Sequence, residues 1–366
     1  IENLEIGERQ IKDVIKEFIR PFDLEQAPLF REGLVEFEEK YLLIFDLHHI
    51  ISDGSSMNIL IKDFIKLYQG QQLRVLKIQY KDFANWQNKL FNSDRIDELE
   101  EYWLDRFETI PVLDLPLDYQ RPEKLDFTGD VVNFKVDVEV TKELKRLALE
   151  QDASLFMTLL AVYNVLLTKY TGQNDLVIGT PIEGRNHGGL ENIIGMFVNT
   201  LALRNNPEED DSFLELLKKV RETTLDAFEH QDYQFEMLVD KLNLKRRLNR
   251  NPLFDTSFSL QSKPGGREGL DNLNFERYDI ENKTAKFDLT LNALETEEGL
   301  NLSFSYSDQL FKRGTILRLA QHLKKIMEEI VSSPEVKLSE IELLSEEEKR
   351  EILTNFNSTK SLLPEE

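Results

Sequence analysis

Cysteine is absent from this chain of 366 residues. Its absence excludes disulfide bonds, a thiolate nucleophile and zinc–thiolate sites, and it agrees with a reducing compartment. Basic residues are also scarce: 45 lysines and arginines stand against 68 aspartates and glutamates, so the formal net charge is −23. A field of that sign repels nucleic acid and anionic membranes, and we expect neither as a partner.

The chain also lacks an apolar run long enough to span a membrane, and no signal peptide opens it. We therefore predict a cytoplasmic location. The first residue is Ile1 rather than methionine, so we expect the start of the coding sequence to be missing. An apolar content of 40% is sufficient for globular folding, and the length indicates two domains rather than one core.

The spacing of apolar residues predicts helices and strands in mixed order. The predicted helices span residues 8–20, 57–68, 80–91, 96–107, 141–151, 155–170, 213–229 and 313–331. The predicted strands span residues 28–37, 41–47, 131–138, 175–179, 196–203, 252–260, 287–294 and 300–306, with a hairpin turn at 38–40. Because strands and helices mix without strict alternation and no repeat is present, the fold class is α/β or α+β, with two layers in each half.

Three prolines interrupt the chain between residues 111 and 122, where no helical spacing is present. We interpret this stretch as a linker between two halves. The polar composition near the C-terminus predicts a second linker, which leads toward a following domain. The predicted division is an N-terminal half at 1–110, a linker at 111–125, a C-terminal half at 126–335 and an exit linker at 336–366.

Two adjacent histidines begin the segment His48–Gly54, which reads H-H-I-I-S-D-G and comes after an apolar strand. Consecutive strand residues point to opposite faces, so only one of the two imidazoles can face a given cleft. A histidine at the end of a strand, beside a turn with a carboxylate, is a suitable proton acceptor at neutral pH. Without further motifs, however, such a pair is more often structural.

Other chemistries fit these residues less well. His48, His49 and Asp53 are the residue types of a 2-His-1-carboxylate iron site, but adjacent strand histidines diverge, so no metal is expected. The G-x-S-x-G elbow of an α/β-type serine hydrolase is missing. His230 and Asp232 offer a second acid–base pair, although helix capping is the favoured interpretation.

Four further segments accompany the histidine motif. They are Y-K-D-F-A-N-W-Q at 80–87, I-G-T-P at 178–181 with Arg185, I-G-M-F-V-N-T at 194–200, and H-Q-D-Y-Q-F-E at 230–236. In this order, the five segments resemble the motifs HHxxxDG, YxDYAxWQ, IGxPxxxR, IGxFVNT and HQDxPFE of the condensation domain of nonribosomal peptide synthetases. The resemblance runs along nearly the whole chain.

The chain departs from the family pattern in three places. Gln234 replaces the usual proline, which we expect to cost some rigidity but no chemistry. Ser55 stands where many members carry a bulkier residue. The family's first motif has no counterpart, so the resemblance implies an incomplete N-terminal half. By contrast, Leu338–Ser345 resembles the exit linker that leads into an adenylation domain.

The resemblance implies a fold of two halves like chloramphenicol acetyltransferase, arranged as a V with a tunnel between them. It implies an amide-forming acyltransferase of antibiotic biosynthesis, which joins two aminoacyl or peptidyl thioesters. These thioesters arrive on phosphopantetheine arms of an upstream and a downstream carrier domain, and an adenylation domain lies adjacent. No cofactor is expected to bind the chain directly.

The resemblance also assigns roles to residues. His49 is implied as the catalytic histidine, with His48 pointing away into the structure. Asp53 is implied to hold the shape of the loop through an arginine, for which Arg185 is the candidate.

Substrate contacts are implied for Gly54, Ser55 and Asn199. Gly54 lacks a Cβ and so permits close approach of a substrate, and its N–H is suited to polarise the thioester carbonyl.

Two other functions stay open at this point. One is a non-catalytic relative that only recruits another protein, although the intact histidine motif argues against it. The other is an epimerisation domain of the same fold. Among condensation domains, Ile50-Ile51-Ser52 and Ser55-Ser56 resemble the type that accepts an L-configured donor.

Overall fold

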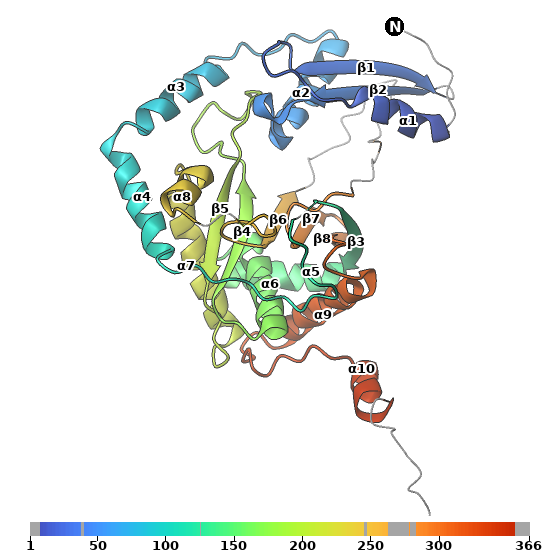
Figure 1. Ribbon diagram of the computed structural model, residues 1–366, viewed down its shortest axis with the longest axis vertical. Coiled ribbons are helices and arrows are strands. Elements are labelled where there is room, and N and C mark those ends of the chain that lie inside the picture. Colours follow the sequence, from blue (N-terminus) through green and yellow to red (C-terminus); the bar gives the residue numbers. More distant parts are fainter. Residues whose placement is uncertain are drawn as a thin grey trace, which may run out of the picture. The chain divides into compact units, whose positions relative to one another are not determined.

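The structure, a computed structural model, describes residues 8–37, 40–124, 126–244, 247–262, 278 and 283–355. The chain forms two compact units (Figure 1). The first contains the described residues up to Ser93 together with Glu183–Val198, and the second contains Asp94–Ile182 and the described residues from Asn199 onward. The predicted mixed α/β fold class is confirmed.

The first unit consists of a hairpin and helices. The hairpin is present as predicted, and its antiparallel strands pair Phe30 with Leu47 and Phe37 with Lys40. Lys40 therefore begins the second strand and is not a turn residue, while residues 38 and 39 lie outside the described residues. A small apolar cluster joins Phe83 of α3 to Phe197 of the 183–198 segment. The elements are α1 (Glu8–Phe18), β1 (Phe30–Phe37), β2 (Lys40–Leu47), the 3₁₀ turn η1 (His49–Ile51), α2 (Gly54–Tyr68) and α3 (Tyr80–Leu90).

A six-stranded mixed sheet organises the second unit, in the order β3-β8-β7-β6-β4-β5 (Figure 1). The pairs β4–β6 and β6–β7 are parallel, and the other pairs are antiparallel. The strands are β3 (Gly129–Val136), β4 (Leu176–Ile182), β5 (Asn199–Asn205), β6 (Thr256–Ser262), β7 (Leu289–Thr296) and β8 (Gly299–Ser307).

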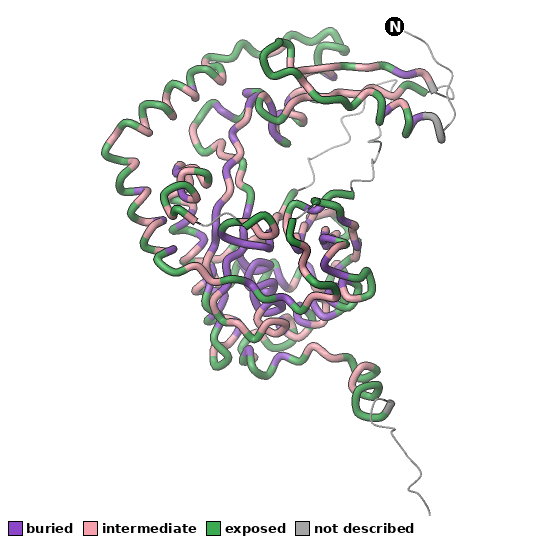
Figure 2. Tube along the Cα trace, viewed as in Figure 1, coloured by how far each residue is buried: buried purple, intermediate pink, exposed green. Residues whose placement is uncertain are grey.

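Helices of the second unit pack against this sheet and against each other. Of these, α6 is buried along most of its length (Figure 2), as its nearly continuous apolar sequence predicts. The helices are α4 (Asp94–Arg106), α5 (Val138–Glu150), α6 (Leu155–Thr171), α7 (Phe213–Glu229), α8 (Phe235–Lys241), α9 (Arg313–Ser332), α10 (Glu346–Arg350) and the π-helix η2 (Glu351–Asn355).

Two of the predicted strands begin three or more residues later than expected. The strand predicted from residue 196 begins at Asn199, because Met196, Phe197 and Val198 belong to the first unit and not to the sheet. The strand predicted from residue 252 begins at Thr256. In the preceding stretch the N–H of Asn251 donates to the side chain of Asp255. The short helix α8 was not predicted.

The boundary between the compact units does not follow the predicted linker. Residues 111–122 are irregular, as expected, but α4 and the linker both belong to the second unit. The first unit also takes up Glu183–Val198, which a division of the chain into consecutive halves does not anticipate. Whether 111–125 separates two functional halves stays a prediction, as do the V and the tunnel.

The first part of the predicted exit linker is packed against the second unit. Leu338 and Ile341 are 3% and 2% exposed and belong to its core. The backbone is held as well, since the N–H of Phe213 donates to Val336 O and the N–H of Leu338 to Asp211 O. The segment that reaches Ile341 is therefore an ordered strap and not a free tether.

Among the described residues, no single helix combines the length and apolarity needed to cross a membrane. Taken together, α5 and α6 are long and apolar enough, but they are bent by 107° relative to each other. The predicted cytoplasmic location stays a prediction.

Truncation of Leu338 tests the strap. Leu338→Ala should lower the free energy of unfolding by about 2–5 kcal/mol, because it opens a cavity in the core. Leu149→Ala is the control, since Leu149 is 79% exposed and its truncation should stay within about 0.5 kcal/mol. Urea denaturation measures both, and equal midpoints for the two variants would show that the strap does not contribute to the core.

Candidate active site

The two histidines lie in a tight turn and not in a strand. β2 ends at Leu47, His48 is extended, and His49 opens the 3₁₀ turn η1. His48 Nδ1 accepts a hydrogen bond from the N–H of Ile50 at 3.1 Å and so caps this turn. The predicted strand alternation between the histidines is therefore wrong, because this cap rotates the backbone before His49.

His48 is half-buried, with its ring edge against Phe22 at 6.1 Å between ring centroids. His49 is exposed, and its Nδ1 lies 2.8 Å from the carbonyl oxygen of Ser52. A carbonyl only accepts hydrogen bonds, so Nδ1 of the neutral ring carries the hydrogen and Nε2 carries the lone pair. The turn thus presents an imidazole whose Nε2 is ready to accept a proton.

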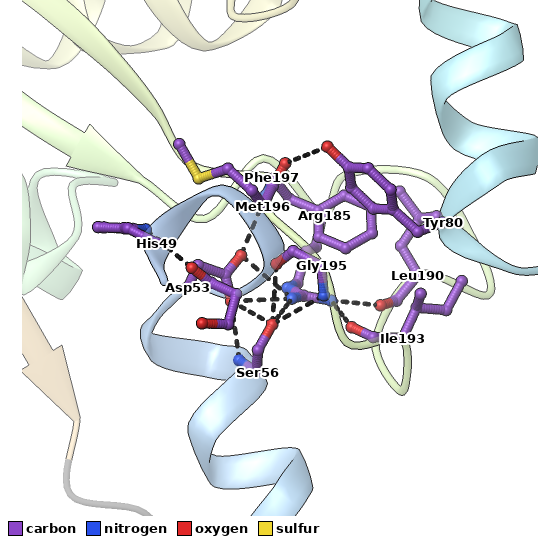
Figure 3. A network of polar contacts seen from close by, with 11 residues as sticks. His49, Asp53, Ser56, Tyr80, Arg185, Leu190, Ile193, Gly195, Met196 and Phe197 are labelled. Carbon is purple, nitrogen blue, oxygen red and sulfur yellow. Dashed lines mark hydrogen bonds and ion pairs between the residues drawn. The ribbon is translucent and has the colours of Figure 1, made fainter. Parts of the chain in front are cut away.

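Asp53 is the hub of the polar network in Figure 3. It caps α2, since the N–H of Ser56 donates to Oδ1 at 2.7 Å. Oδ2 accepts the N–H of Phe197 at 3.2 Å, and Arg185 donates to both oxygens at 2.9 and 3.1 Å. Burial raises the pKa of Asp53, but the hydrogen bonds from Ser56, Arg185 and Phe197 outweigh it, so the pKa is lower than its ordinary value of 3.8.

Arg185 links Asp53 to the loop that follows Arg185 in the chain. The side chain of Asp53 is 0% exposed and that of Arg185 is 6% exposed. A second guanidinium nitrogen, Nη1, donates to the carbonyls of Leu190 and Ile193, both at 2.7 Å, and the guanidinium lies over the ring of Phe197 at 4.1 Å. The structure thus brings the predicted partners together, while the effect of the pair on activity stays a prediction.

Gly54 and Ser55 form the first turn of α2, directly after the histidine turn. Gly54 is exposed, and no atom lies within 4 Å of the position that a Cβ would take. Within the described part of the chain, neither backbone N–H has a hydrogen-bond acceptor, as is usual at a helix start. Both groups can therefore donate to an oxygen of a substrate, and that role stays a prediction.

Asn199 has a different environment, inside the second unit. Its Nδ2 donates to the carbonyls of Gln231 and Tyr233 at 2.9 and 2.8 Å. Its Oδ1 accepts the N–H groups of Thr200 and Phe235 at 2.8 and 3.1 Å. These four bonds use the full capacity of the amide, so the geometry favours a structural role over the predicted substrate contact. Asn199 joins the fourth and fifth motifs.

His230 occupies the C-cap of α7, where its Nδ1 lies 2.7 Å from the carbonyl oxygen of Asp226 and its ring stacks on Tyr102. The structure therefore supports the capping interpretation for this histidine. Among the residues that the structure describes, no three His, Asp or Glu side chains are grouped to hold a metal ion.

Two side chains of the network were not predicted as site residues from the sequence. Ser56 donates and accepts at the centre of the network, and Tyr80 donates to Met196 O at 2.9 Å. The pKa of Tyr80 is raised by burial and by the negative charge of Asp53, so its hydroxyl remains a donor. The sequence contains a feature that points to each of them. Ser56 is at the third helical position after the capping Asp53, where a residue bonds to the cap, and Tyr80 is the first residue of the second motif.

Comparison with known proteins gives a consistent result. The family model of the condensation domain matches residues 1–353. Gramicidin S synthase 2 of Aneurinibacillus migulanus is 50% identical over 358 residues, which cover 97% of this chain and 8% of that protein. The chain therefore spans less than a tenth of the curated relatives that it matches first.

Two solved structures share the fold. The X-domain in its complex with OxyB from teicoplanin biosynthesis has a TM-score of 0.84 at 24% identity, over 94% of this chain and 79% of that one. A four-domain nonribosomal peptide synthetase, holo-AB3403 bound to AMP and glycine, has a TM-score of 0.80 at 25% identity, over 94% of this chain and 28% of that one.

Replacement of Asp53 by asparagine tests the buried ion pair. Asp53→Asn leaves Arg185 uncompensated and should destabilise the first unit by about 3–5 kcal/mol at pH 7. Because the folded pKa of Asp53 is lower than 3.8, its contribution is complete above that value and is lost as the pH falls through the folded pKa. The difference between Asp53→Asn and the unsubstituted chain should therefore shrink in acid below pH 3.8.

Denaturant-dependent hydrogen exchange of the peptide that contains Phe197 measures this stability in the first unit. Asp13→Asn, on the exposed face of α1, is the matched control and should change nothing. A pH-independent difference between Asp53→Asn and the unsubstituted chain would contradict the assigned ionisation.

Proposed function

Because this chain belongs to the condensation-domain family, we propose that it forms a peptide bond between two aminoacyl or peptidyl thioesters. The observation that carries the proposal is the exposed imidazole of His49, whose Nδ1 is held by Ser52 O so that Nε2 is the proton acceptor. This is the group that an attacking amine requires, and it lies in the motif by which the family is recognised.

In the proposed reaction, the α-amine of the acceptor attacks the carbonyl carbon of the donor thioester. The new C–N bond forms and the C–S bond breaks, while the amine proton passes to Nε2 of His49, which then gives that same proton to the leaving thiolate, so that a thiol departs and the neutral imidazole is restored. The N–H groups of Gly54 and Ser55, which have no acceptor among the described residues, are suited to donate to the carbonyl oxygen as negative charge develops on it.

Positioning is the larger contribution to the rate. Proton transfer by a well-placed base typically contributes about 10²–10⁴-fold. Holding both substrates in reacting geometry contributes up to about 7–11 kcal/mol in well-oriented cases. A thioester is already activated toward amines, so the proposed chemistry depends on orientation and on one base.

Carrier domains that present phosphopantetheine arms are the proposed partners, with an adenylation domain adjacent. Support comes from the identity to a short part of gramicidin S synthase 2 and from the shared fold with a four-domain synthetase. In this proposal the arms are parts of the substrates, and the product belongs to antibiotic biosynthesis of the kind that the relatives' names indicate.

A recruitment function is the second candidate. The observation in its favour is the fold shared with an X-domain that forms a complex with OxyB. The identity of 24% supports the fold alone, and the H-H-x-x-x-D-G motif with its base is intact in this chain. A recruitment module has no need of such a base, so we favour catalysis. An epimerisation domain is a third candidate, because the fold does not exclude it.

Substitution of His49 tests the proposed chemistry. In a protein that carries this chain with its flanking sequence, His49→Ala should lower the single-turnover rate of peptide formation about 10²–10⁴-fold, because the amine loses its base. Stability should change by no more than about 0.5 kcal/mol, since His49 is exposed. Loaded donor and acceptor carriers, with products measured by mass spectrometry, provide the readout.

Ile61→Ala is the control, because it truncates an exposed side chain of α2 in the same unit, outside the histidine turn, and should preserve the rate. Unchanged turnover in His49→Ala would refute the role of the imidazole. Absence of peptide with the unsubstituted protein and both carriers would favour recruitment, and inversion of a single loaded residue without an acceptor would favour epimerisation.

We also propose an L-configured donor, which the resemblance of Ile50-Ile51-Ser52 and Ser55-Ser56 supports. Carriers loaded with the L- and D-forms of one donor should differ in single-turnover rate by at least about 10-fold, a gap of about 1.4 kcal/mol in activation free energy. Faster turnover of the D-form would reverse the assignment.

A further inference from the structure

Three consecutive residues of the 183–198 segment are each held by one residue from the first part of the chain (Figure 3). Both peptide groups of Gly195 bond to Ser56, with N–H to Oγ at 3.0 Å and Oγ to the carbonyl at 2.8 Å. The hydroxyl of Tyr80 donates to Met196 O, and the N–H of Phe197 donates to Asp53. We call Gly195–Phe197 the clamped segment. All of these contacts lie within the first unit.

The hydroxyl of Ser56 has one proton and two acceptors within reach, Asp53 Oδ1 and Gly195 O, each at 2.8 Å. Asp53 keeps donors from Arg185, from Phe197 and from the Ser56 backbone, so the proton can serve Gly195 without leaving the carboxylate unsatisfied. Ser56 is 1% exposed, and its loss would leave buried peptide groups of Gly195 without partners.

The aromatic ring of Tyr80 packs closely against the same segment. The ring lies where a Cβ on Gly195 would be, only 2.1 Å from that position, and it meets the ring of Phe197 edge to face at 5.1 Å. The hydroxyl then fixes Met196 O at the far end of the ring. Together the ring contact and the hydrogen bond fix the clamped segment relative to the first residue of α3.

The clamp reaches His49 through a short covalent path. Ser52 O, which holds Nδ1 of His49, belongs to the peptide group that joins Ser52 to Asp53. Asp53 is fixed in turn by Ser56 and by the clamped segment. A displacement of the clamped segment would therefore shift Asp53 and, through this peptide group, the carbonyl oxygen that holds the imidazole.

We propose that Ser56 and Tyr80 are positioning residues, which orient Nε2 of His49 by clamping Gly195–Phe197 against the histidine turn. This inference rests on the proposed function, and it adds to it two residues that act through the histidine turn. It separates the base itself from the groups that keep the base in reacting geometry.

Single-turnover peptide formation, in a protein that carries this chain with its flanking sequence, tests the inference. Ser56→Ala and Tyr80→Phe should each lower the rate about 10- to 100-fold, because small displacements of a reacting group have effects of that size. Half-saturating substrate concentrations should stay within about twofold. Ser56→Thr keeps the hydroxyl and should recover most of the rate.

A double-substitution cycle distinguishes positioning from general support of the fold. In the His49→Ala background, Ser56→Ala and Tyr80→Phe should cost less than about threefold, because no base remains to be positioned. Equal costs in both backgrounds would overturn the inference. Tyr80→Phe removes only one oxygen and so keeps the test valid if Ser56→Ala unfolds.

Matched controls come from the same unit. Ser93→Ala removes a hydroxyl that donates to Leu90 O at the end of α3, and Tyr41→Phe removes one from a tyrosine that is 63% exposed. Both should keep the unsubstituted rate. Full activity of Ser56→Ala and Tyr80→Phe would overturn this inference alone, whereas absence of peptide with the unsubstituted protein would overturn the proposed function and this inference with it.

Discussion

The buried ion pair of Asp53 and Arg185 is the interaction on which the geometry of the first unit depends. Two charges that are almost fully removed from water are tolerated only when hydrogen bonds satisfy them from several sides. Those bonds come from the start of α2, from the loop at Leu190 and Ile193, and from the N–H of Phe197. If either side chain moved, the other would be left as a buried charge without its partner. The ion pair therefore holds these stretches in one arrangement, and the histidine turn, which directly precedes Asp53, is held with them.

Local patterns were enough to locate most helices and strands. The buried faces of α7 and α9 are built mainly from residues three and four positions apart, and the β1–β2 hairpin pairs neighbours in the chain, so periodicity reports them directly. Asp53 and Arg185 are 132 positions apart, and no periodicity connects them. That partnership was predictable only from the resemblance to a family whose motifs contain both residues.

Where the structure differs from what the sequence pattern suggested, contacts between residues outside the local pattern explain the difference. Met196–Val198 has the apolar composition of a strand, but its backbone groups bond to Tyr80 and Asp53. Asn199 looked like a substrate ligand because it lies in a motif, yet four backbone groups occupy its amide. The strap looked like a tether because it is polar overall, while the two side chains Leu338 and Ile341 anchor it.

The first unit is discontinuous in the chain, and the contact between Tyr80 and Gly195 therefore constrains protein engineering. The ring of Tyr80 fits against Gly195 only because Gly195 has no Cβ. Tyr80 also donates a hydrogen bond to Met196, the next residue, which lies 116 positions away in the chain. A crossover point placed between them in a chimaera would combine α3 of one parent with the 183–198 loop of another. Swaps that keep this contact must transfer both stretches from the same parent.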